Sequence, residues 1–273
     1  MTTPVAHATR ATPTTHRFAR VVAVGLVAGF LSGLFGVGGG ILIVPALVLL
    51  LAFDQRRAHG TSLAAVLPIA ISSLASYALE DKVDWTVGAL LAVGAVAGAV
   101  IGTYVLNRLP HDVLAITFAL LLAATAVRLL FDHSEGDGRG NLTIIAALAL
   151  VGIGVVTGVL AGLLGVGGGV FVVPVMVVFF GIPAVVAKGT SLFMIVPTSI
   201  MGTWRNRKKG NADLDVALLL GMAGVVSAFV AGKISVGMSE KLSNTLFAVL
   251  LLVVGARILW QVRVDRRRPA SVT

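Results

Sequence analysis

Two glycine-rich runs are the parts of this sequence best suited to bind a solute. Each run reads Gly-Val-Gly-Gly-Gly and interrupts a long apolar stretch. Glycine is a weak helix former, so three glycines in a row predict a break in the helix. The helix that starts after such a break has free N–H groups and the positive end of its dipole, and both favour an anion. The candidate anion-binding residues of the two runs are Gly36, Val37, Gly38, Gly39, Gly40, Gly165, Val166, Gly167, Gly168 and Gly169.

A Gly-Thr-Ser-Leu sequence follows each glycine run and supplies further candidate donors. We expect its hydroxyl residues, Thr61, Ser62, Thr190 and Ser191, to open the next helices. There they would either contact the anion or cap the helix, and the sequence leaves both roles open. The residues just before these sequences are His59 and Lys188. They are either vestibule charges of an anion path or ordinary interfacial residues whose ends reach water.

The two runs belong to two copies of one sequence unit. Alignment of the chain with itself at an offset of 129 residues places Gly38 on Gly167 and Asp84 on Asp213, and other glycines and prolines also align. Apolar composition alone would not align these residue types, so the sequence predicts a duplication. The predicted segments are an N-terminal tail (1–20), a first repeat (21–130), an external linker (131–141), a second repeat (142–260) and a basic C-terminal tail (261–273).

The elements that position these residues are predicted to be membrane helices. Hydrophobic residues make up 57% of the chain and charged residues 12%, whereas soluble domains are about 45–50% apolar and about 25% charged. This composition excludes soluble enzymes, disordered chains and nucleic-acid binders, despite a net charge of +9. Each repeat holds one glycine-interrupted stretch and three stretches of about 20 residues, which is the length of a transmembrane helix. The predicted fold is an all-α integral membrane protein, a polytopic bundle.

The residue types also limit the chemistry of the protein. The chain has no cysteine, which excludes disulfides, Fe–S clusters and thiolate zinc sites. We expect no cofactor and no metal. The middle of each apolar stretch lacks ionisable residues, and buried carboxylates usually mark proton relays and cation paths. A proton pump or a cation carrier is therefore disfavoured.

The charges in the loops predict how the chain threads the membrane. If each interrupted stretch enters and returns on one side, as a re-entrant hairpin or as two short crossings, 15 of the 21 lysines and arginines share the side of the N-terminus. The acidic loops Glu80–Asp84 and Asp132–Asp137 then face the other side. Basic loops are typically cytoplasmic, so both termini are predicted to be cytoplasmic. Three spans plus an even-crossing element invert the second repeat, and inverted repeats with broken helices are typical of secondary transporters.

The two glycine motifs resemble those of a known family. Gly-Leu-Phe-Gly-Val-Gly-Gly-Gly-Ile-Leu-Ile-Val-Pro (33–45) and its mate at 162–174, each followed by Ala-x-Gly-Thr-Ser-Leu, are similar to the sulfite exporter TauE/SafE family. The resemblance covers roughly residues 21–260. It implies an inner-membrane permease for sulfur-containing anions such as sulfite, thiosulfate or organosulfonates. The implied partners are a small anionic substrate and the lipid bilayer, with no nucleic acid, and the oligomeric state stays open.

Three rival functions remain to be compared with a permease. An anion channel and a non-transporting accessory protein share the same composition. An intramembrane serine protease would need a serine and a histidine at similar depth. Ser32 has Ala161 as its repeat mate, and His59, His111 and His133 are predicted at loop positions. We therefore expect no enzyme.

Overall fold

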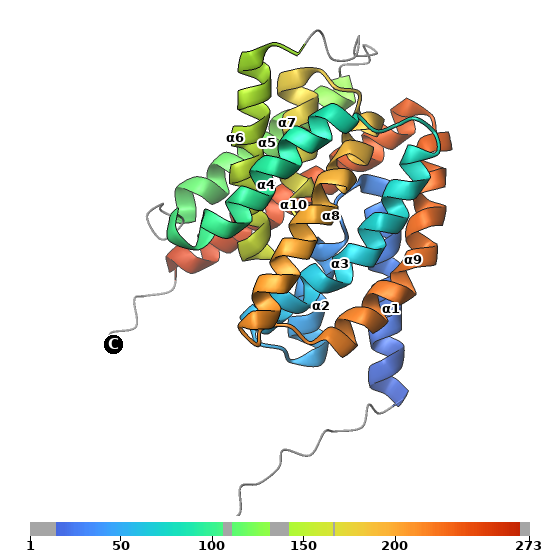
Figure 1. Ribbon diagram of the computed structural model, residues 1–273, viewed down its shortest axis with the longest axis vertical. Coiled ribbons are helices and arrows are strands. Elements are labelled where there is room, and N and C mark those ends of the chain that lie inside the picture. The colour runs from blue at the N-terminus through green and yellow to red at the C-terminus, as the bar shows by residue number, and fades with distance from the viewer. Residues whose placement is uncertain (1–14, 106–110, 132–141, 166, 268–273) are drawn as a thin grey trace, which may run out of the picture.

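The computed structural model describes residues 15–105, 111–131, 142–165 and 167–267. These residues form ten α-helices and no strand (Figure 1). The helices of the first repeat are α1 (Thr15–Phe35), α2 (Gly40–Leu51), α3 (Gln55–Ala78), α4 (Trp85–Val105) and α5 (His111–Phe131). Those of the second repeat are α6 (Ile144–Leu164), α7 (Gly169–Phe180), α8 (Ala184–Lys208), α9 (Leu214–Gly237) and α10 (Glu240–Arg267).

The helices repeat as the sequence does. The helices α1 and α6 both have 21 residues, and α2 and α7 both have 12. One glycine run separates α1 from α2, and the other separates α6 from α7. The outer helices extend beyond the predicted bounds of the repeats, since α1 begins at Thr15 and α10 ends at Arg267. The duplication is therefore visible in the helices themselves.

Six of the described helices are long and apolar enough to cross a membrane. They are α1, α3, α6, α8, α9 and α10. At 12 residues, α2 and α7 are too short to cross alone, because about 20 residues are needed. The described side chains of α4 and α5 cover shorter apolar segments, Trp85–Val100 and Ala119–Phe131. The protein is an all-α integral membrane protein, as predicted.

Helices of each repeat pack against helices of the other repeat. Helix α1 packs along α9 of the second repeat, and its mate α6 packs along α4 of the first. Glycines allow these close crossings: a Cβ at Gly94 or Gly98 would overlap a carbonyl oxygen of α6, and one at Gly158 would overlap Ala95 O. Small residues at helix crossings let backbones approach in lipid. Gly94 and Gly98 therefore serve helix packing.

Ion pairs show which turns share an end of the molecule. Arg57, after α2, pairs with Asp213, before α9, at 2.7 Å. We call the end that carries the α2–α3 and α8–α9 turns the basic end. At the opposite end, Lys233 of α9 pairs with Glu80 of the α3–α4 loop. The hydrogen bond and the charge of Lys233 lower the pKa of Glu80. We call this opposite end the Glu80 end.

Helices α1 and α2 form a hairpin whose outer ends meet. Arg20 and Val21 at the start of α1 line one small hollow with Leu50 and Leu51 at the end of α2. The chain thus enters and leaves this element at the same end of the molecule, which is the arrangement assumed for the threading. Which end faces the cytoplasm, and the inversion of the second repeat in the membrane, stay predictions.

Candidate functional site

Both glycine runs break the helix, and positive φ angles explain why glycine stands there. In the first run φ is 69° at Gly36, 77° at Gly38 and 72° at Gly39. In the second run the matching values include 78° at Gly167 and 87° at Gly168. Side chains with a Cβ rarely adopt this left-handed region, whereas glycine does so at no steric cost. The unwound segments predicted from the sequence are present. Val166 lies outside the described residues.

The two breaks meet at the centre of the molecule. A Cβ at Gly38 would lie 3.2 Å from both Val66 and Ile195, and one at Gly167 would lie 3.2 Å from Ile195 and 3.5 Å from Val66. Val66 in α3 and Ile195 in α8 are repeat mates at the same offset of 129 residues. Both side chains are fully buried. The glycine runs therefore converge, and in this conformation two apolar side chains fill the space beside them.

The N–H groups at these breaks lack acceptors within the described part of the chain. In α2 the first backbone bonds within the helix are those from Leu42 and Ile43 to Gly39 O, at 3.1 and 3.2 Å. None of the described hydrogen bonds uses the N–H groups of Gly38, Gly39 or Gly40. The second break matches, with Gly168 O accepting from Phe171 and Val172. The donors left over at its start belong to Gly167, Gly168 and Gly169.

The hydroxyl residues tie each repeat to the break of the other. Ser62 Oγ donates to Gly165 O at 2.8 Å, and Ser191 Oγ donates to Gly36 O at 2.6 Å. All four hydroxyl residues are fully buried. In this conformation the two serine protons serve the fold, because they satisfy backbone carbonyls freed by the breaks.

The two threonines make a second reciprocal pair of bonds. Thr61 Oγ1 accepts from the Asp213 N–H, and Thr190 Oγ1 accepts from the Asp84 N–H, both at 2.9 Å. Each bond joins the start of one long helix to a loop of the other repeat. A role in anion binding for these four residues stays a prediction.

The expectation that Thr61 and Thr190 open their helices is wrong. Helix α3 begins at Gln55 and α8 at Ala184, so both threonines lie in the second turn. Asp54 caps α3 by accepting from the Arg57 N–H at 3.0 Å, and Pro183 precedes α8 with the fixed φ that suits a helix start. The capping role considered for the hydroxyls is thereby excluded.

His59 and Lys188 occupy equivalent places beside the breaks. A Cβ at Gly36 would lie 2.7 Å from Lys188 Cα, and one at Gly165 would lie 2.8 Å from His59 Cα. His59 is half-buried, whereas Lys188 is completely buried. Lys188 Nζ donates to Ser243 Oγ at 2.7 Å. Lys188 is therefore not an interfacial residue with its end in water, and a vestibule role for either residue stays a prediction.

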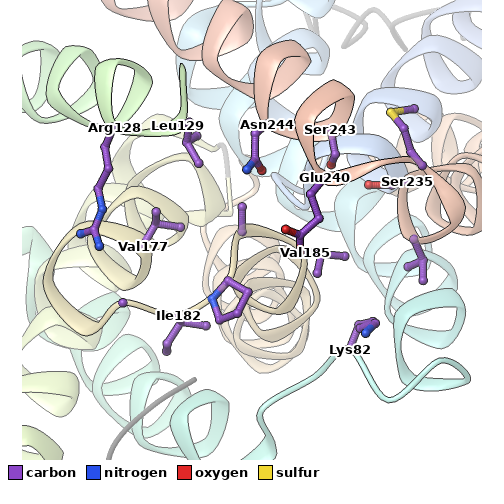
Figure 2. Close-up of a pocket in the computed structure, with 15 residues that line it drawn as sticks. Lys82, Arg128, Leu129, Val177, Ile182, Val185, Ser235, Glu240, Ser243 and Asn244 are labelled. Atoms are coloured by element: carbon purple, nitrogen blue, oxygen red, sulfur yellow. The ribbon is translucent and has the colours of Figure 1, made fainter. Parts of the chain in front are cut away.

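A cavity of about 190 Å³ opens at the Glu80 end, beside Lys188. Its polar lining is Lys82, Arg128, Ser235, Glu240, Ser243 and Asn244 (Figure 2). Drug-sized ligands need pockets of about 300–1,000 Å³, so this volume suits a small solute. Sequence reasoning missed the lining residues of α5 and α10, because polar residues near helix ends carry no motif. Among the described residues, no cluster of histidine and acidic side chains could hold a metal ion.

Comparisons with known proteins point to one family. Residues 4–129 and 150–273 match the model of the family described as Sulfite exporter TauE/SafE. Probable membrane transporter protein YunE of Bacillus subtilis is 28% identical, covering 89% of this chain and 98% of its own length. A probable membrane transporter protein of Haemophilus influenzae is 30% identical, covering 85% of this chain and 94% of its own. A probable membrane transporter protein of Methanocaldococcus jannaschii is 26% identical, covering 88% of this chain and 94% of its own length. No solved structure matches the chain. These matches indicate a membrane transporter.

Proposed function

The chain belongs to the sulfite exporter TauE/SafE family, and from this premise we propose that it is a secondary transporter, a permease, for small anions. The substrates in this proposal are sulfur-containing oxyanions or organosulfonates such as sulfite. The protein lies in the inner membrane, with both termini in the cytoplasm. It acts without enzymatic chemistry and without a cofactor.

The observation that carries the proposal is the convergence of two broken helices whose N–H groups have no acceptor among the described residues. Gly38 and Gly167 both lie against Val66 and Ile195, and the glycines of both breaks are buried. A buried donor without an acceptor costs about 1–3 kcal/mol. An anion between the breaks would accept from both sets of donors and would meet the positive ends of two helix dipoles. A cation would be repelled by the same donors.

The apolar side chains that fill the space beside the glycine breaks favour a carrier over a channel. Val66 and Ile195 are fully buried against the breaks, so an anion reaches the donors only after these side chains move. A carrier needs such a rearrangement in every cycle, whereas a conducting pore needs a continuous open path. Saturable counterflow of substrate would identify a carrier. An accessory protein would give no flux at all.

Uptake into proteoliposomes tests the proposed function. The purified protein is assayed with sulfite, thiosulfate, methanesulfonate, acetate and a set of inorganic cations. We expect saturable uptake of at least one sulfur-containing anion and none of the cations. Protein-free liposomes provide the control. Uptake of cations alone, or no uptake of any solute by correctly folded protein, would contradict the proposal.

The pair Ile195→Asp and Ile195→Asn tests the anion site directly. If unused N–H groups surround this position, an introduced carboxylate accepts from them and occupies the place of the substrate. We expect Ile195→Asp to block uptake and to be at least as stable to heat as Ile195→Asn. Without such donors, a buried unpaired carboxylate costs several kcal/mol. Unfolding of the Asp variant beside a folded Asn variant would therefore rule out the anion site.

A further inference from the structure

The cavity at the Glu80 end lies over the first turn of α8. Its floor includes the turn Gly181–Val185, which joins α7 to α8. The first backbone bond of α8 runs from Ala187 N to Pro183 O, and no side chain caps the start of this helix. The N–H groups of Ala184 and Val185 have no acceptor among the described residues. The lining thus includes backbone donors at a helix N-terminus.

The second feature of the cavity is a buried hydroxyl with a proton to donate. Ser243 lines the cavity and is only 5% exposed. Its oxygen accepts from Lys188 Nζ at 2.7 Å, and none of the described hydrogen bonds uses its proton. Because the hydroxyl already accepts from an ammonium group, its own proton is polarised toward an acceptor.

Positive charge dominates the surroundings of the cavity. Lys82 and Arg128 line it together with one acid, Glu240 (Figure 2). Arg128 also donates to Val178 O at 2.6 Å, which holds its guanidinium over the end of α7. Lys188 stands behind Ser243, with its ammonium 5.2 Å from the centre of the Phe247 ring. The charged side chains of the lining, two basic residues and one acid, are together net positive.

We propose that this cavity is a binding site for the substrate anion, separate from the glycine breaks, and that Lys188 supplies its charge through Ser243. The ligand is a small oxyanion or sulfonate. Its oxygens accept from the Ser243 hydroxyl and from the N–H groups that start α8. This inference rests on the proposed function for the identity of the ligand, but the cavity and its charge are testable without transport.

Lys188 also connects the cavity to the centre of the molecule. Its backbone lies against Gly36 of the first break, while its side chain reaches the lining residue Ser243. Lys188 thus contacts both the first break and the lining of the cavity. The equivalent residue of the other repeat, His59, lies against Gly165 on the basic-end side. In this proposal the cavity is the anion-binding site on the Glu80 side of the breaks.

A charge-selective thiol reaction tests the proposal in the full-length protein. The chain has no native cysteine, so Asn244→Cys places a single thiol in the cavity. Its rates with anionic sulfonatoethyl methanethiosulfonate and with the cationic trimethylammonioethyl analogue are compared. Ser239→Cys, at an exposed residue at the same end that does not line the cavity, corrects for intrinsic reactivity. We expect the anionic reagent to be favoured at Asn244→Cys by about tenfold over this control.

Substitution of Lys188 then identifies the source of the selectivity. Lys188→Met keeps an unbranched side chain one atom shorter and removes a buried amino group, a change that folds tolerate well. Added to Asn244→Cys, it should remove most of the anionic preference, and methanesulfonate should lose its protection of the thiol. Ser243→Ala should weaken the protection while leaving Lys188 in place. Size-exclusion elution and thermal unfolding check that each variant is folded.

The outcomes separate this proposal from the proposed function. Equal relative rates at Asn244→Cys and Ser239→Cys, or an anionic preference unchanged by Lys188→Met in a folded protein, would overturn the cavity proposal even if the wild type transports anions. Conversely, anion-selective labelling with protection by methanesulfonate supports the cavity even if the transport panel fails. If Lys188→Met does not fold, the loss of protection in Ser243→Ala decides the question.

Discussion

At the scale of single residues, the serines after each glycine run hydrogen-bond to the breaks in this conformation. Ser62 and Ser191 each donate across the repeat boundary to the first glycine of the other break. Another buried serine further along α8 differs. Ser199 Oγ is buried and has no hydrogen-bond partner among the described residues. Identical residue types on one helix therefore have opposite energetic roles.

This contrast predicts opposite effects for two alanine substitutions in α8. Ser191→Ala leaves Gly36 O without its donor and should destabilise the protein by about 1 kcal/mol. Ser199→Ala removes an unpaired hydroxyl and should leave stability unchanged or raise it. Thermal unfolding of the purified protein in detergent measures both. Equal losses in the two variants would contradict the assigned bonds.

At the scale of helices, glycines serve two separate purposes. Gly38 and Gly167 need positive φ angles and lie against Val66 and Ile195. A valine at either position would be strained in its backbone as well as in its contacts, so a loss of transport there would not separate binding from folding. Substitution of Ile195 is the more informative probe of the centre for that reason. Gly154 and Gly158 of α6 instead allow close packing on α4.

Two glycines of α6 provide a matched test of helix packing. A Cβ at Gly158 would overlap the backbone oxygen of Ala95 in α4, whereas one at Gly152 meets nothing within 4 Å. Gly158→Ala should force the helices apart and destabilise the protein by about 1–3 kcal/mol. Gly152→Ala should be neutral or stabilising by up to about 1 kcal/mol, because alanine is the better helix former. Yield and thermal unfolding measure both variants, and a tolerated Gly158→Ala would refute the close crossing.

At the scale of the whole molecule, charge separates the two ends. Arg57, Arg205, Arg207 and Lys208 lie at the basic end, around the α2–α3 and α8–α9 turns. Arg205 there donates to the carbonyl oxygens of Ala99 and Val100 at the same end of α4. By the positive-inside rule we predict that this end faces the cytoplasm.

Side-specific labelling tests the orientation of the molecule. Lys209 and Ser239 are exposed and lie at opposite ends. A membrane-impermeant thiol reagent added to intact cells should label Ser239→Cys and should label Lys209→Cys only after the membrane is opened. Permeabilised cells show that both thiols react. Labelling of both from outside would reject the predicted topology, and the reverse pattern would invert it.

The sequence by itself determined the features that depend on local chemistry. Apolar stretches of membrane length, the duplication and the two breaks follow from composition and from the absence of a Cβ in glycine. The same local reading misplaced the helix starts near Thr61 and Thr190, because the Gly-Thr-Ser sequence looks like a helix beginning. Asp54 and Pro183 in fact start these helices more than one turn earlier.

Only the tertiary structure decided which residues from distant parts of the chain meet. Val66 and Ile195 fill the space beside both breaks, and Lys188 is buried against Ser243, which lies 55 residues further along the chain. No spacing rule predicts such contacts, because they depend on how α3, α8 and α10 cross one another. For the same physical reason, a buried ammonium beside a polar cavity could be recognised only after the helices had been placed.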